Sequence, residues 1–195
     1  DYQPSRGLGD VYKRQEPFTL VGATTRLGNI STPMRDRFGA IFRLDFYQKG
    51  EIFKILKRTA SILEMNIQDD ALTEIAGRSR GTPRIANRVL KRVRDFAQVK
   101  NVKEISLEDA RSSLDSIGID ENGLENMDRK ILKNLIVNYN GGPTGGKSLA
   151  ISINEDIQTI EDVYEPYLIK EGFIERTSRG RIATDKAYAL FDLKK

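Results

Sequence analysis

The chain has 195 residues, 38% hydrophobic and 31% charged, which is enough for one ordinary domain or two small ones. It contains neither cysteine nor histidine, which excludes disulfides, thiolate or imidazole metal sites and catalysis by Cys or His. No apolar run approaches the roughly 20 residues that span a bilayer, so we exclude a membrane protein and expect a cytoplasmic one. The net charge of +4 suits nucleic-acid binding without establishing it.

The N-terminal part predicts two strands. Residues 1–15 have neither helical nor strand periodicity, and we leave them out as a leader. Residues 18–24 form a short apolar, β-branched run that ends in small polar residues, as a buried parallel strand does before a functional loop. Residues 41–46 alternate between apolar and charged side chains, which predicts a second strand. Both strands need sheet partners and covering helices to bury their apolar faces.

Apolar stripes at helical spacing predict helices between residues 52 and 116. Thr82 and Pro83 predict the start of one helix, and Ser106 with Asp109 predicts a capping box at the start of another. The acidic, glycine-bounded segment 118–123 is predicted as a linker. The stripes consist of Ile52, Leu56, Ala60 and Leu63, of Leu72, Ile75 and Ala76, and of Ile85, Val89, Val93 and Phe96.

Beyond the linker, the order of elements is that of a winged helix. A stripe predicts a helix from 127 to about 139, and a later stripe containing Ile160, Val163 and Leu168 predicts a helix that ends at Gly172. Two short strand patterns then flank the turn Thr-Ser-Arg-Gly, which predicts a hairpin.

Three arginines, Arg176, Arg179 and Arg181, lie close together at this hairpin. A cationic tip with a glycine can follow a phosphate backbone, and the lack of an aromatic residue predicts contact without sequence preference. The alternative is a solvated hairpin without a ligand.

Residues 141–148 (GGPTGGKS) satisfy the pattern G-x-x-x-x-G-K-[ST] of a phosphate-binding loop. Such a loop needs a buried strand before it and a long helix after it, whereas the segment before residue 141 has a helical stripe. We therefore interpret residues 141–148 as a glycine-rich connection between helices. A stand-alone nucleotide-binding enzyme that uses Lys147 remains the rival hypothesis.

Three sequence runs resemble the RuvB family of AAA+ ATPases: 21–26 (VGATTR), 31–47 (STPMRDRFGAIFRLDFY) and 78–97 (RSRGTPRIANRVLKRVRDFA). The similarity continues at 127–132 (MDRKIL) and at 159–184 (TIEDVYEPYLIKEGFIERTSRGRIAT). It implies an α/β remnant of an AAA+ ATPase core, an all-α lid and a C-terminal winged-helix domain. The implied boundaries are 1–15 for a non-matching leader, 16–48 for the last core strands, 49–120 for the lid and 121–195 for the winged helix.

The resemblance assigns roles to individual residues near a nucleotide. Thr25 corresponds to the sensor of the γ-phosphate, and Arg37 to the arginine finger that reaches the neighbouring subunit's nucleotide, with Arg35 as the fallback. Arg84 corresponds to the second sensor, which ties the lid to its own subunit's nucleotide, and Tyr47 to a position that packs beside it. The structural alternatives are threonines that end a strand and arginines that pair with nearby carboxylates.

The resemblance also implies the activity and the partners. The family drives Holliday junction branch migration in recombination, DNA repair and the SOS response, as a hexameric DNA translocase or helicase that uses ATP and Mg²⁺ and works with RuvA and RuvC. Arg176 and Arg181 correspond to DNA-contacting positions. The family's phosphate-binding loop and acidic magnesium motif precede the first strand and are not found here, so we expect this chain alone not to hydrolyse ATP. The alternative function is a non-enzymatic winged-helix DNA-binding protein, which leaves the turn around Arg37 unexplained.

Overall fold

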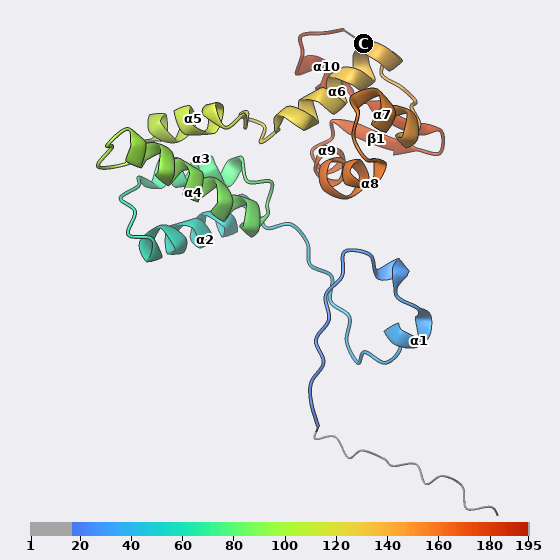
Figure 1. The fold of residues 1–195 in the computed structure, drawn as a ribbon, viewed down its shortest axis with the longest axis horizontal. Helices are drawn as coiled ribbons and strands as arrows, with labels where there is room; N and C mark the ends of the chain where they lie inside the picture. The colour runs from blue at the N-terminus through green and yellow to red at the C-terminus, as the bar shows by residue number, and fades with distance from the viewer. Residues whose placement is uncertain (1–16, 195) are drawn as a thin grey trace, which may run out of the picture. The chain divides into compact units, whose positions relative to one another are not determined.

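The structure, a computed structural model, describes residues 17–194 and divides into one unit that ends at Leu44 and another that begins at Asp45 (Figure 1). In the described part of the first unit, residues 17–44, the regular elements are the short 3₁₀ helix η1 (Leu27–Asn29) and the single turn α1 (Thr32–Arg35). The leader predicted at residues 1–15 lies outside the described residues. No helix within 17–194 is both long and apolar enough to cross a membrane.

The two strands predicted at 18–24 and 41–46 are not formed, so this prediction is wrong for the structure. Their apolar side chains are exposed, with Val21 at 85% and Leu44 at 92% relative exposure. A strand is stable only when its N–H and C=O groups pair with a neighbouring strand, and within residues 17–194 no strand lies beside either segment. The side chains alternate as in a strand, but within residues 17–194 no neighbouring strand pairs with the backbone of either segment.

Four helices follow in the second unit: α2 (Lys49–Ile62), α3 (Asp69–Gly77), α4 (Pro83–Val99) and α5 (Leu107–Ser116). The predicted stripes supply one hydrophobic core, since Ile52, Leu56, Leu72 and Val93 are at most 2% exposed. The capping box at the start of α5 is confirmed: the Ser106 and Asp109 side chains each accept the other's backbone N–H. Thr82 precedes α4 as predicted, but its side chain makes no capping hydrogen bond.

The C-terminal elements build a second core around a small sheet. The strands β1 (Ile174–Thr177) and β2 (Gly180–Ala183) pair antiparallel, with Ile174 opposite Ala183 and Thr177 opposite Gly180, which confirms the predicted hairpin. Thr144 adds an isolated antiparallel bridge to Arg181, so the hairpin has a third, very short neighbour. The helices are α6 (Asn126–Tyr139), α7 (Gly146–Ile153), α8 (Ile157–Thr159), α9 (Glu165–Lys170) and α10 (Asp185–Ala189), with the π-helical stretch η2 (Ile160–Tyr164) between α8 and α9.

The helical stripe predicted around Ile160 is interrupted at Val163, which is 57% exposed. Pro166 has no N–H to donate to the carbonyl four residues before it, and the helix widens into the π-helical stretch just ahead of this proline. Widening changes the angle per residue, so the regular spacing no longer places Val163 on the buried face.

The predicted linker at 118–123 lies between α5 and α6, but it is a closed turn whose ends are buried. Ile119 is 5% exposed, and the Asp120 carboxylate accepts the N–H groups of Asn122 at 2.9 Å and Leu124 at 2.8 Å. The acidic side chain that suggested a solvated connection therefore satisfies backbone donors instead.

Candidate functional site

Arg37 presents an unengaged guanidinium in the first unit. It lies in the turn after α1, where its backbone N–H donates to the Met34 carbonyl at 3.3 Å, and its side chain is exposed. Within residues 17–194 it has no carboxylate partner, so the alternative of an ion pair with Asp36 is not formed. Arg35, the fallback, is half-buried and donates to the Thr32 hydroxyl at 3.1 Å. Of the two arginines, Arg37 is the one available to a ligand.

Thr25 lies in the same unit at an exposed bend. The neighbouring Thr24 hydroxyl accepts the N–H of Arg26 at 3.0 Å, which closes the bend locally. The strand end at which the resemblance places Thr25 is absent here, so its role as a sensor stays a prediction.

Arg84 and Tyr47 come from two segments that meet at the turn before α4. The Tyr47 N–H donates to the Gly81 carbonyl at 2.9 Å, and the Tyr47 side chain is 46% exposed. Arg84, the second residue of α4, is exposed and has no ion-pair partner among the described residues. A helix N-terminus already carries partial positive charge, so a cation there is unfavourable unless an anion faces it. The turn therefore favours a negatively charged ligand.

The wing presents two further arginines. Thr177 and Gly180 are paired, so Arg179 lies in the two-residue tip between them; its side chain is exposed and without a partner in the described part of the chain. The Arg176 side chain is 56% exposed and lies 3.4 Å from a Glu161 carboxylate oxygen and 3.8 Å from one of Glu165. Both guanidinium groups are accessible to a phosphate backbone.

The structure corrects the predicted placement of Arg181 at the exposed tip. Its side chain is 7% exposed, its Nε donates to Glu165 at 2.6 Å, and its Nη2 donates to Glu161 at 2.6 Å. Burial alone lowers the pKa of Arg181, but the hydrogen bonds to the two carboxylates outweigh it and raise the pKa. Arg181 fastens the wing to the helix before it, which leaves the outward contacts to Arg176 and Arg179. Glu161 and Glu165, four residues apart, were the signal in the sequence that we missed.

The segment that imitates a phosphate-binding loop is used for packing. It follows helix α6 instead of a strand, and the Thr144 N–H donates to the Arg181 carbonyl at 2.9 Å. A Cβ on Gly142 would lie 2.2 Å from that same carbonyl, and one on Gly146 would lie 2.4 Å from Nη1 of Arg181. Glycine is needed because β2 approaches so closely, which supports our rejection of a nucleotide loop built on Lys147.

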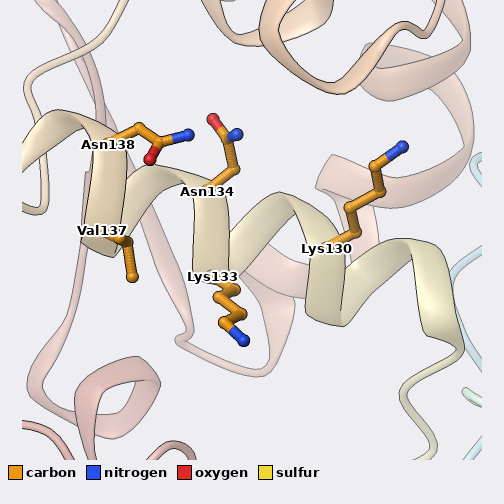
Figure 2. Close-up of a pocket in the computed structure, with 5 residues that line it drawn as sticks. All are labelled: Lys130, Lys133, Asn134, Val137 and Asn138. Carbon is orange, nitrogen blue, oxygen red and sulfur yellow. The ribbon is translucent and has the colours of Figure 1, made fainter.

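A shallow hollow of about 230 Å³ lies on the exposed face of α6 (Figure 2). Two of the polar side chains that line it already make hydrogen bonds within the protein. Lys130 donates to the Ile153 carbonyl at 2.7 Å, and the Asn134 amide oxygen accepts from Ser152 at 2.8 Å. Lys133 and Val137 point to the opposite side of the helix from Lys130 and Asn134, so the hollow has no converging polar set. Within residues 17–194 no three acidic residues are grouped so that they hold a metal ion.

Three family models match consecutive parts of the chain. A model described as the Holliday junction DNA helicase RuvB P-loop domain matches residues 10–44, and so begins inside the segment we predicted as leader. The model of the RuvB AAA lid domain matches 47–120, and that of the RuvB C-terminal winged helix domain matches 121–192.

Curated relatives and solved structures agree with these matches. The Holliday junction branch migration complex subunit RuvB of Oleidesulfovibrio alaskensis is 55% identical over 178 residues, covering 91% of this chain and 56% of the relative. The protein of the same description from Prosthecochloris aestuarii is 56% identical over 181 residues, covering 93% and 53%. The structure of the Thermotoga maritima RuvB Holliday junction branch migration motor aligns with a TM-score of 0.87 at 49% identity, covering 92% of this chain and 60% of that one. The chain thus spans about half the length of the curated relatives it matches.

Proposed function

Because the chain belongs to the RuvB family of AAA+ ATPases, we propose that it is part of an ATP-driven DNA translocase that moves Holliday junctions. The observation that carries the proposal is the pair of exposed guanidinium groups, Arg37 and Arg84, which have no ion-pair partner in residues 17–194. Both lie at positions to which the family resemblance assigns contacts with nucleotide phosphates. A homo-hexamer, RuvA and RuvC as partners, and a cytoplasmic location belong to the same proposal.

Each of these guanidinium groups, unpaired among the described residues, suits the phosphates of a nucleotide. When bound, ATP with Mg²⁺ supplies the phosphoryl group whose transfer drives the motor. Arg37 neutralises the negative charge that grows on this group in the neighbouring subunit, and such fingers contribute on the order of 10³–10⁵ in rate in well-measured GTPases. Arg84 binds a phosphate of its own subunit's nucleotide, and Tyr47 packs beside that nucleotide. Thr25 orients the attacking water by a hydrogen bond of its hydroxyl group. These four roles are proposals that rest on the resemblance.

The wing is proposed to hold the duplex through Arg176 and Arg179 without reading its sequence. In a winged helix or helix-turn-helix regulator, sequence is read by a helix that enters the major groove. Here residues 157–170 contain a single cation, Lys170, among several acidic residues, and so offer few groups that could bind a phosphate backbone. The acidic helix argues against the alternative of a sequence-specific winged-helix regulator.

A chimera tests this function. Residues 17–195 replace the aligned part of the Thermotoga maritima protein, and migration of a synthetic four-way junction is measured with ATP. We expect ATP-dependent migration, its loss together with hydrolysis in Arg37→Ala, and unchanged rates in the control Lys147→Ala. A chimera that hydrolyses ATP normally after Arg37→Ala would contradict the finger assignment. The 195-residue chain alone is expected to release no phosphate from ATP, and DNA-stimulated release by it would contradict that expectation.

A further inference from the structure

Three consecutive polar residues, Arg78, Ser79 and Arg80, are buried in the turn that joins α3 to α4, at 6%, 0% and 7% exposure. Buried arginines are rare and need partners, because an unpaired charge in the protein interior costs several kcal/mol. Arg80 also has a positive φ of 57°, a conformation that is unfavourable for a residue with a side chain. The surroundings must therefore fix Arg80 by several contacts at once.

Within the described residues, the side-chain partners of Arg80 come from the winged helix and the turn that precedes it. Its Nε donates to the Gly123 carbonyl at 2.9 Å, and its Nη2 binds the Asp128 carboxylate. Its guanidinium carbon lies 4.7 Å from the centre of the Tyr167 ring. Arg80 belongs to the helical lid, so one side chain joins three separate segments beyond residue 120.

Asp128, the carboxylate that pairs with Arg80, is fully buried in the first turn of α6. The same carboxylate oxygen that binds Arg80 also accepts the Glu125 N–H at 2.7 Å. Burial raises the pKa of Asp128, and the adjacent Arg80 opposes that rise. Arg80 thus favours the ionised form of the buried Asp128 carboxyl group.

Further contacts near the Arg80–Asp128 pair stabilise the same connection between the lid and the winged helix. The Tyr167 hydroxyl donates to the Asn122 carbonyl at 2.7 Å, and Arg78 donates to the Ile119 carbonyl at 3.1 Å. Burial raises the pKa of Tyr167 to about 12, so this hydroxyl keeps its proton and its hydrogen bond over the whole neutral range. Arg88 makes one more ion pair between the two parts, with Glu125 at 2.9 Å, but that pair is exposed.

Arg80 is also close in sequence to the residue that faces the proposed nucleotide. Only Gly81, Thr82 and Pro83 separate it from Arg84, and a Cβ on Gly81 would lie 2.7 Å from the Tyr47 carbonyl. The turn is therefore tightly packed on the side of the nucleotide-facing residues and ion-paired on the side of the winged helix. The segment between Arg80 and Arg84 is thus short and closely packed.

We propose that Arg80 is a positioning residue: by its ion pair with Asp128 it fixes the winged helix on the lid, so that movement at Arg84 is carried to the DNA-contacting wing. The mechanical role rests on the proposed function. The fixed orientation itself does not, because it concerns only the contacts of Arg78, Arg80 and Arg88 with residues 119–167.

The orientation is measured on the 195-residue chain without nucleotide or DNA. The chain has no cysteine, so introduced cysteines at Lys103 in the lid and Lys147 in the winged helix carry spin labels for a distance distribution. Arg80→Met removes the charge and keeps a long apolar stem, and Arg88→Met is the matched control, because it removes an exposed ion pair between the same two parts. Circular dichroism and binding of a short duplex report whether each part stays folded.

We expect Arg80→Met to broaden the distance distribution while helix content and duplex affinity are retained, and Arg88→Met to leave the distribution unchanged. Amides of residues 119–128 are expected to exchange on the order of 10²-fold faster in Arg80→Met. An unchanged distribution in folded Arg80→Met overturns the proposal, as does equal broadening in both variants.

If Arg80→Met does not fold, the nearly isosteric variant Asp128→Asn is tested in its place. Broadening of its distance distribution with helix content and duplex affinity retained supports the proposal, and an unchanged distribution overturns it. Loss of folding in both variants also overturns the proposal, since the pair would then be needed for the fold itself and not for orientation. Failure of the branch-migration function leaves these distances unaffected, so the two proposals fail separately.

Discussion

Replacing Glu165 by glutamine removes the buried charge that holds the wing. Glu165 is 1% exposed and accepts hydrogen bonds from Arg181 Nε at 2.6 Å and Nη2 at 3.3 Å. Glutamine keeps the size and one acceptor oxygen, but of the carboxylates paired with Arg181 within residues 17–194 it leaves only Glu161. Removing one partner of a buried ion pair costs about 3–5 kcal/mol, and because Glu161 remains we expect about 3 kcal/mol.

Tyrosine fluorescence during urea unfolding measures this cost. Four of the seven tyrosines lie in the winged helix, the other three (Tyr2, Tyr12 and Tyr47) precede the lid helices, and the chain has no tryptophan to dominate the signal. With a denaturant slope of about 2 kcal/mol/M, the expected loss lowers the urea midpoint by about 1.5 M at unchanged slope. The four are Tyr139, Tyr164, Tyr167 and Tyr188.

Glu161→Gln is the matched control for Glu165→Gln. Glu161 binds the same guanidinium, but its side chain is 32% exposed, so water replaces part of the interaction and we expect a loss of about 1 kcal/mol. If Glu165→Gln costs no more than Glu161→Gln, burial of the pair does not determine the stability of the wing, and our explanation of the inward Arg181 is refuted.

Three further predictions concern glycine packing, acid stability and DNA contact. Gly146→Ala is expected to destabilise the chain in urea, because its Cβ would lie 2.4 Å from Nη1 of Arg181, whereas Gly50→Ala in open space is expected to stabilise it by about 0.5–1 kcal/mol. Burial tends to raise the pKa of Glu74, but the hydrogen bonds from two arginines outweigh it and lower the pKa below 4.5. Glu74 therefore contributes stability above pH 4.5 that is lost as the pH falls through its folded pKa, and circular dichroism from pH 6 to 2.5 should show a shallower loss in Glu74→Gln. Arg179→Ala is expected to weaken duplex binding equally for unrelated sequences and to reduce the salt slope by about 1; a sequence-dependent effect in a binding titration would count against a phosphate contact.

The helices of the lid were predictable because their signals are local. The stripe with Ile52 and Leu56 repeats at the helical period, and both residues are fully buried. The capping box joins Ser106 to Asp109, three positions along the chain, and forms as predicted. Such features depend on neighbours along the chain, which the sequence states directly.

The features that sequence reasoning missed depend on partners far away along the chain. Residues 41–46 alternate like a strand, yet alternation identifies the two faces of a strand and not the neighbour it pairs with. The segment 118–123 is polar in composition, yet Arg78 and Arg80 reach it from 41 to 43 residues away and bury its ends. Long-range partners decided both outcomes, and local composition does not encode them.

Two arginines of this chain, Arg37 and Arg181, show which long-range feature separates a ligand-facing side chain from a structural one. Each lies beside a turn, and each was predicted to be exposed. Arg37 has Asp36 as its neighbour, but within residues 17–194 the two side chains form no ion pair. Arg181 meets Glu161 and Glu165, which are spaced by four residues and converge on one point. Two acids at helical spacing in the element packed against the turn, together with burial, thus distinguish the structural Arg181 from the exposed Arg37.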